Sequence, residues 1–243
     1  MFDLRDVESF KSFLRDLVRD YQFDVIGLYC RDGSIRPLPR ESSVVGKVIE
    51  ISLNEYLQRK LLSVPNLKHV KASGERSYPD ISFSGALIYP HQYALDVKCA
   101  RIKGDRTESA ITIGTFDAEY FRYPEEKAAN IMAPYSSYSA HLALIALYRY
   151  EDATARDIEI LIVEKWRVAT KKRSSGTRCY VGAVKRLEDL RAERGDFDSE
   201  EEFSSFWRSQ AIDSSKENRW EAKRAASAEK KSRRRGPPAP FGD

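Results

Sequence analysis

The spacing of apolar residues along the chain predicts both helices and strands. In residues 3–21, apolar side chains recur every three or four positions, as on one face of a helix, and Asp3 can cap its start. A second helix with the same spacing is expected over residues 43–62, capped by Ser42 or Ser43. Each of these helices therefore has one apolar side to bury.

Residues 136–150 are apolar almost throughout, and we expect them to form a helix buried against a sheet. The last helix is expected to begin at Asp198 or Ser199, where Ser199 and Glu202 fit a capping box. Shorter apolar or alternating runs predict strands, of which the first two flank an Asp-Gly turn signal: residues 23–30, 35–38, 81–89, 93–100, 110–116 and 158–166.

Two acids and a lysine stand out in the stretch from Pro79 to Lys98. Pro79-Asp80 directly precedes one predicted strand, and Asp96-Val97-Lys98 lies in the next, 16 residues after Asp80. Alternate side chains of a strand point the same way, so Asp96 and Lys98 share a face while Val97 points toward the core. If the two strands pair as an antiparallel hairpin, Asp80 can lie close to both.

Two carboxylates and an ammonium that converge could hold a divalent metal and a scissile phosphate. Carboxylates are hard oxygen ligands of the kind that Mg²⁺ prefers, and a bound metal lowers the pKa of water and neutralises charge on the phosphate. The lysine can steady or deprotonate the attacking water, or offset the developing charge. Asp-x-Lys is nonetheless a common sequence, and polar residues at a strand end explain it as well on this pattern alone.

Glu50 is a candidate third acid, because it lies on the predicted helix that precedes the hairpin. The other interpretation is a solvated helix glutamate.

Composition narrows the class of protein. The chain has 243 residues, 42% hydrophobic and 32% charged, which is enough to bury a sizeable core, and no apolar run approaches the roughly 20 residues of a membrane span. The net charge of +4 permits an anionic partner without requiring one.

Three widely spaced cysteines without a Cys-x-x-Cys argue against a zinc site or a disulfide framework and favour a reducing cytoplasm. Of the three scattered histidines, His141 is expected to be a packed, hydrogen-bonded residue.

Basic residues concentrate in three stretches, at 165–173, 185–194 and 216–235. The segment 167–182 also contains small hydroxyl residues and glycines, so it is either a solvated loop or a loop that approaches a polyanion and reaches base edges. Residues 213–243 are polar and basic and predict a helical or disordered tail after a main domain at 1–212.

Several motifs in the same order resemble one family, the type II restriction endonucleases of the EcoRV type, within the PD-(D/E)xK nuclease superfamily. The resemblance covers roughly residues 20–210. It rests on the early strand pair, the metal hairpin, the start of the apolar run, the strand before the basic loop and the last helix: Phe23–Leu28 with Asp32–Leu38, Tyr78–Asp80 with Leu95–Lys98, Tyr138–His141, Glu164–Trp166, and Phe197–Phe203 with Trp207-Arg208.

The resemblance implies an α/β (α+β) fold with a central mixed β-sheet flanked by helices. It implies a Mg²⁺-dependent homodimer that cuts both strands of double-stranded DNA at a short palindromic site. Asp80 and Asp96 would be metal ligands, Lys98 the catalytic lysine and Glu50 the auxiliary acid. A minor-groove loop at 73–77 and a major-groove recognition loop would supply the DNA-binding residues: Gly74, Glu75, Arg76, Arg173, Ser174, Ser175, Gly176, Thr177, Arg178 and Tyr180.

The two loops depart from the family pattern. The recognition loop of the family is rich in Gly, Asn and Thr and its minor-groove loop has glutamines, whereas this chain has Ser174–Tyr180 and Gly74-Glu75-Arg76. Because Arg suits the O6 and N7 atoms of guanine, we hypothesise that Arg178 reads a guanine and that the site differs from that of EcoRV.

Two rival functions remain at the level of sequence: a repair or recombination nuclease that recognises DNA structure, and a DNA-binding protein without activity. A DNA methyltransferase is expected in the same bacterial system as a restriction enzyme. The N-terminal helix and the strand pair at 23–38 are candidates for the subunit contact, although their apolar faces could equally be intramolecular core.

Overall fold

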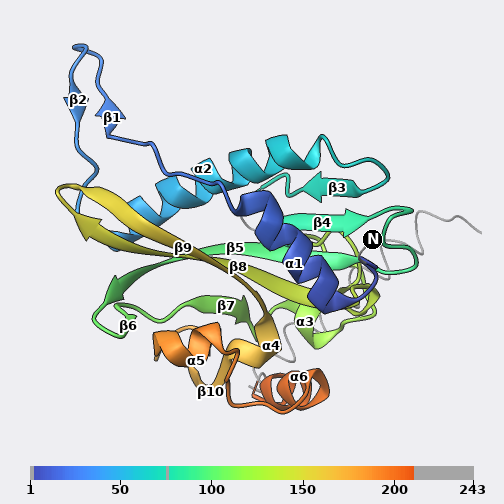
Figure 1. Cartoon of the computed structure of the whole chain (residues 1–243). Helices are drawn as coiled ribbons and strands as arrows, with labels where there is room; N and C mark the ends of the chain where they lie inside the picture. Colours follow the sequence, from blue (N-terminus) through green and yellow to red (C-terminus); the bar gives the residue numbers. More distant parts are fainter. Residues whose placement is uncertain (1–2, 75–76, 211–243) are drawn as a thin grey trace, which may run out of the picture.

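The structure, a computed structural model that describes residues 3–74 and 77–210, contains a central β-sheet flanked by helices (Figure 1). The strands of this sheet are β3 (Lys68–Lys71), β4 (Ile81–Ser84), β5 (Tyr93–Lys103), β6 (Arg106–Thr107), β8 (Ala140–Glu151) and β9 (Thr154–Glu164). They lie in the order β3-β4-β5-β8-β9, and β6 pairs with β5. Because β5 and β8 are parallel and the other neighbours antiparallel, the sheet is mixed, which confirms the predicted fold class.

Two smaller sheets accompany the central one. A two-stranded ribbon is formed by β1 (Leu28–Tyr29) and β2 (Ile35–Arg36), and a three-stranded sheet by β7 (Thr112–Thr115), β10 (Ala169–Arg173) and β11 (Tyr180–Ala183) in the order β10-β11-β7. The helices are α1 (Val7–Val18), α2 (Ser42–Leu61), α3 (Glu119–Arg122), α4 (Lys165–Val168), α5 (Leu187–Arg191) and α6 (Glu200–Ser209). No helix of the described residues is long and apolar enough to cross a membrane.

The alternation of side chains along β5 separates two hydrophobic cores. Leu95 and Val97 belong to the core that α1 and α2 cover, while Ala94 and Ala100 belong to the core on the other face, which includes β7, β11 and α6. Val97 is fully buried, as expected for a strand residue between two polar neighbours. Asp96 and Lys98 therefore share the face opposite α1 and α2.

The prediction of a helix over residues 136–150 is wrong, because this run forms β8. The strand is buried on both faces: Leu142 and Leu144 pack into the core of α1 and α2, and Ala143 and Ile145 into the opposite core. A strand covered on both sides reads as a continuous apolar run, and periodicity cannot distinguish it from a buried helix.

Helix starts were predicted with mixed success. At α6 the Ser199 side chain accepts a hydrogen bond from the Glu202 amide, and the Glu202 carboxylate accepts one from the Asp198 amide, which confirms the predicted cap. The predicted cap of the first helix is wrong, since Asp6 rather than Asp3 accepts from the first turn of α1. Likewise α2 begins after Glu41 and has no side-chain cap hydrogen bond.

The β1–β2 ribbon projects away from the rest of the protein (Figure 1). Its apolar side chains are exposed: Leu28 by 48%, Tyr29 by 80% and Ile35 by 55%. By contrast, Phe10 and Leu14 of α1 are fully buried in the chain's own core. Of the two candidate subunit contacts, the ribbon has the more exposed apolar surface, since Phe13 and Leu17 of α1 are partly buried against the core. The predicted tail, at residues 213–243, lies outside the described residues.

Gly195 fixes the position of the segment that enters β10. A Cβ atom at this position would lie 2.5 Å from the Ala169 carbonyl oxygen and 2.7 Å from that of Arg167, too close for either backbone to accommodate. We therefore expect Gly195→Ala to lower the free energy of unfolding by about 1–3 kcal/mol, the usual effect of overpacking. Urea unfolding measures the change. Gly176→Ala is the matched control, because nothing lies within 4 Å of its added carbon, and an equal loss in both variants would contradict the expectation.

Candidate active site

The register of β4 and β5 brings Asp80 beside Asp96. Ile81 faces Leu95 in this antiparallel pair, so the next position along places Asp80 opposite Asp96. Each carboxylate holds the other strand: the Val97 amide donates to Asp80 Oδ2 at 2.7 Å, and the Asp80 amide donates to Asp96 Oδ1 at 3.3 Å. The two acids are thus fixed relative to each other through the backbone.

Lys98 lies between the two acids. Its Nζ atom is 3.8 Å from Asp80 Oδ2 and 3.6 Å from Asp96 Oδ2. The side chains of Lys98 and Asp80 remain 29% and 27% exposed, so both can reach a bound molecule, whereas Asp96 is only 10% exposed. The structure therefore brings together the three hairpin residues that the sequence singled out.

The surroundings move the pKa values of the two acids in opposite directions. Burial, followed by the negative charge of Asp96, raises the pKa of Asp80. Burial would also raise the pKa of Asp96, but the ammonium groups of Lys165 and Lys98 lower it to about 2. Asp96 is therefore a stable carboxylate at neutral pH.

Glu50 projects from α2 and is less closely joined to the site. Its carboxylate accepts a hydrogen bond from Lys47 at 3.2 Å, and its charge helps to raise the pKa of Lys98. Within residues 3–74 and 77–210, no three acid, histidine or cysteine side chains lie close enough together to form a metal site by themselves. The role of Glu50 as a third acid stays a prediction.

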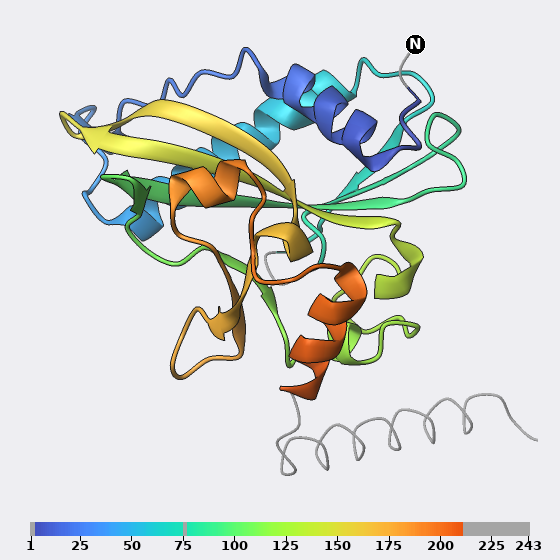
Figure 2. The ribbon, with the colours of Figure 1, turned by 60° about the horizontal axis from the view of Figure 1, so that its bottom comes forward.

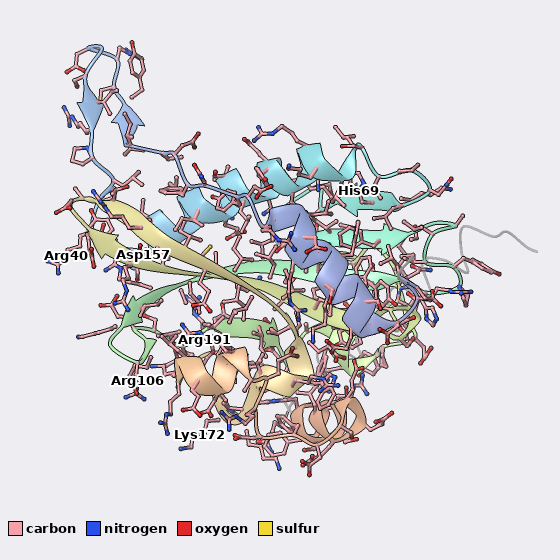
Figure 3. The ribbon with its side chains drawn as sticks, in the orientation of Figure 1. Arg40, His69, Arg106, Asp157, Lys172 and Arg191 are labelled. Atoms are coloured by element: carbon pink, nitrogen blue, oxygen red, sulfur yellow. The ribbon has the colours of Figure 1, made fainter. Side chains whose placement is uncertain are left out.

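Two carboxylates nonetheless fit a magnesium ion. Mg²⁺ is commonly held by one or two carboxylates together with substrate phosphate oxygens and water. Asp80 and Asp96 offer oxygen donors of this kind at the floor of an open cleft. Among the described residues, no histidine belongs to a group that could hold a metal ion. His141 is buried and shares a 2.6 Å hydrogen bond with the Tyr78 hydroxyl, His91 shares one of 2.9 Å with the Ser139 hydroxyl, and His69 lies on the edge strand β3 (Figure 3).

A cleft of about 690 Å³ joins the hairpin to β7 and the β10–β11 arm. It is lined by Asp80, Asp96 and Lys98, by Ser77 and Tyr78 just before the hairpin, and by residues that were not among the predicted site residues: Thr112, Gly114, Thr115, Ala118, Glu119, Tyr120, Ala128, Ala129 and Asn130. Tyr180, one of the predicted DNA-binding residues, completes the lining. The cleft is therefore bounded by the acids on one side and by the arm on the other.

The β10–β11 arm carries the predicted recognition loop, and Figure 2 shows it extending away from the central sheet. Inside the loop, the Ser175 hydroxyl accepts hydrogen bonds from the amides of Thr177 and Arg178. Arg178 is exposed, and its guanidinium donates to the Tyr180 hydroxyl at 3.0 Å. At the base of the loop the Ser174 hydroxyl lies 3.2 Å from that of Thr112.

The other predicted DNA-binding residues lie on the surface or outside the described residues. Arg173 is exposed and its guanidinium stacks over the Phe116 ring, and Gly176 is exposed at the tip of the arm. Gly74 is exposed, and its carbonyl accepts a hydrogen bond from the amide of Ser77, which lines the cleft. Glu75 and Arg76 lie outside the described residues.

Lys165 is the residue at this site that the sequence did not reveal. Its ammonium lies 2.5 Å from Asp96 Oδ2, although the two residues are far apart in the chain and belong to no common motif. In the sequence, Lys165 belongs to the basic stretch 165–173 and to Glu164-Lys165-Trp166, which resembles a strand of the family, and neither feature points to a contact with Asp96.

The class follows from a mixed sheet with a β4–β5 hairpin that begins directly after Pro79-Asp80 and contains Asp96-Val97-Lys98 in β5. This is the restriction-endonuclease-like fold of the PD-(D/E)xK nucleases. Comparison with known proteins narrows this class. Residues 19–229 match the family model described as restriction endonuclease EcoRV, and the chain belongs to that family. It is also similar to the type II restriction enzyme EcoRV of Escherichia coli, with 21% identity over 210 residues, covering 77% of this chain and 82% of that protein.

Proposed function

We propose that this protein is a Mg²⁺-dependent type II restriction endonuclease that cuts both strands of DNA at a short palindromic site. The observation that carries the proposal is the joint placement of Asp80, Asp96 and Lys98 in one cleft, with Tyr180 of the arm on its rim. Family membership supports a nuclease of the restriction type.

In this proposal the chain's own groups hold and orient the reactants. A bound Mg²⁺ would supply a water of lowered pKa and neutralise charge on the phosphate. Asp80 and Asp96 would hold the ion, and hydrogen bonds from the amides of Val97 and Asp80 help to orient the two carboxylates. Lys98, which is within 4 Å of both acids, would donate to the attacking water or to a phosphate oxygen.

DNA cleavage by the wild type and by Asp96→Asn tests the assignment of the site. We expect Mg²⁺ or Mn²⁺ to support discrete cleavage of linear plasmid by the wild type, and Asp96→Asn to reduce the rate at least about a thousandfold, since metal-ion stabilisation is worth several kcal/mol. DNA binding without metal should persist. Asp152→Asn, an exposed acid with an 81% accessible side chain, is the control and should cut normally.

The other outcomes identify the rival functions. A continuous smear of fragments, without discrete bands, would favour a nuclease that recognises DNA structure. A wild type that binds DNA and never cuts it with either metal would favour a DNA-binding protein.

We propose that Arg178 recognises a guanine. Its side chain is exposed on the arm and donates a hydrogen bond to the Tyr180 hydroxyl. A bidentate contact to guanine discriminates by about 1–3 kcal/mol. Arg178→Ala should therefore lose roughly tenfold to a hundredfold in selectivity at one base pair, as measured by sequencing the ends of cut plasmid libraries. Lys172→Ala on the same arm (Figure 3) is the control, because an exposed lysine suits a phosphate and should not change the preference. Unchanged ends with Arg178→Ala would remove this assignment.

A palindromic site calls for a two-fold symmetric homodimer, and the exposed β1–β2 ribbon is our candidate contact. Tyr29→Asp should place a charge in the interface and shift sedimentation from twice the chain mass of 27.9 kDa toward the monomer. Leu62→Asp is the control, since Leu62 follows the last residue of α2 and is 79% exposed. A dimer that persists in Tyr29→Asp would move the contact elsewhere.

The remaining expectations follow from restriction biology. A DNA methyltransferase in the same bacterial system would protect the host's own sites, and the enzyme would act in the cytoplasm. The three cysteines support this location, because all of them are free thiols.

A further inference from the structure

A second lysine contacts the candidate metal ligand from behind. The Lys165 ammonium lies 2.5 Å from Asp96 Oδ2, and the Lys165 side chain is only 6% exposed. Lys98 approaches the same oxygen at 3.6 Å from the cleft. The two lysines differ in access: Lys98 lines the cleft and Lys165 does not. Because the Lys165 side chain is almost fully buried and lines a small cavity next to the cleft rather than the cleft itself, Asp96 is its direct link to the site.

An aromatic cluster holds the Lys165 ammonium in place. The ammonium lies 4.5 Å from the centroid of the Tyr78 ring, a distance suited to a cation–π contact. Tyr78 is buried, stacks on Tyr120 at 4.8 Å, and forms a hydrogen bond with His141. Because Tyr78 directly precedes Pro79-Asp80, Lys165 contacts both β5, at Asp96, and the segment that leads into β4.

The residues on either side of Lys165 are joined by hydrogen bonds between their side chains. Lys165 is the first residue of α4, immediately after β9. The preceding residue, Glu164, accepts hydrogen bonds from Trp166 Nε1 at 3.0 Å and from Arg167 Nε at 2.7 Å. The chain then continues through α4 into β10, the first strand of the recognition arm. Lys165 thus joins the arm's supporting segment to the acid that would bind metal.

We propose that Lys165 is a positioning residue for DNA cleavage, which holds the Asp96 carboxylate in its metal-binding orientation. The inference rests on the proposed function. Its physical basis is that Asp96 Oδ1 is held by a hydrogen bond of 3.3 Å from Asp80, so the shorter contact to Oδ2 is the stronger restraint on rotation of the carboxylate. Burying an ammonium is unfavourable unless it is paired, and Asp96 is the partner within salt-bridge distance of Lys165.

Two substitutions separate orientation from packing. Lys165→Met keeps an unbranched apolar chain and removes every donor, whereas Lys165→Gln keeps one N–H donor for Asp96. Removing a group that orients a metal ligand typically costs 10–100-fold in metal affinity or activity. We expect Lys165→Met to raise the Mn²⁺ concentration for half-saturation, measured by electron paramagnetic resonance on the free protein, by about tenfold or more. We also expect kcat to fall with little change in DNA affinity, and Lys165→Gln to show the smaller loss.

Lys11→Met is the matched control. Lys11 is also a buried lysine, paired with Glu8 at 2.8 Å and Glu193 at 2.6 Å, and it does not line the cleft. This variant should lower the melting temperature while leaving Mn²⁺ affinity and kcat unchanged below that temperature. Equal effects of Lys11→Met and Lys165→Met on Mn²⁺ affinity would reduce Lys165 to a general stabilising residue and overturn the inference.

The wild type distinguishes this inference from the function on which it rests. If the wild type cuts DNA and both Lys165 variants match it in Mn²⁺ affinity and kcat, only the positioning role is wrong. If the wild type neither cuts DNA nor binds Mn²⁺ in a manner that Asp96→Asn abolishes, the proposed function and the positioning role both fail.

Discussion

The pairing of β4 with β5 is the constraint on which the candidate site depends. One register places Asp80 opposite Asp96 and sends Val97 into the core of α1 and α2. Because side chains alternate along a strand, a slip of one residue would turn Asp96 and Lys98 into that core and Val97 into the cleft. Burial of Leu95 and Val97 therefore stabilises the register that the chemistry requires, and the hydrogen bonds between Asp80 and Val97 and between Asp96 and Asp80 fix its local geometry.

Charge balance is the second condition for the site. Four ionisable groups gather in a partly buried space, two carboxylates and two ammonium groups. A buried charge that lacks a partner is strongly destabilising, and each of these groups has an opposite charge within 4 Å. The positions are not equivalent, since Asp96 lies between both lysines and has a pKa of about 2, while the pKa of Asp80 is raised. The more exposed Asp80 and Lys98 are left facing the cleft.

The proposed elements for cutting and for recognition lie on different parts of the fold that share one core. The hairpin belongs to the central sheet, and the arm to the sheet of β10, β11 and β7. The second core joins them: Phe116, which follows β7, stacks on Trp207 of α6 at 5.0 Å, and the same cluster includes Val181 of β11 and Ala143 of β8. The loop on the arm can therefore differ from that of relatives without altering the hairpin.

The sequence by itself determined the features that depend on short range. Residues close together in the sequence specify three features, which could therefore be predicted: the alternation along β5, the cap of α6, and the hairpin with Asp80, Asp96 and Lys98. The sequence did not determine the state of residues 140–151, since whether such an apolar run is a strand or a helix depends on what covers it. The sequence also assigned no role to Lys165, because its partner Asp96 lies in β5, far away along the chain. Only the tertiary structure, which pairs β8 with both β5 and β9 and places α4 at the end of β9, could bring a buried ammonium to that carboxylate, and only the tertiary structure showed that the apolar ribbon at β1–β2 is exposed.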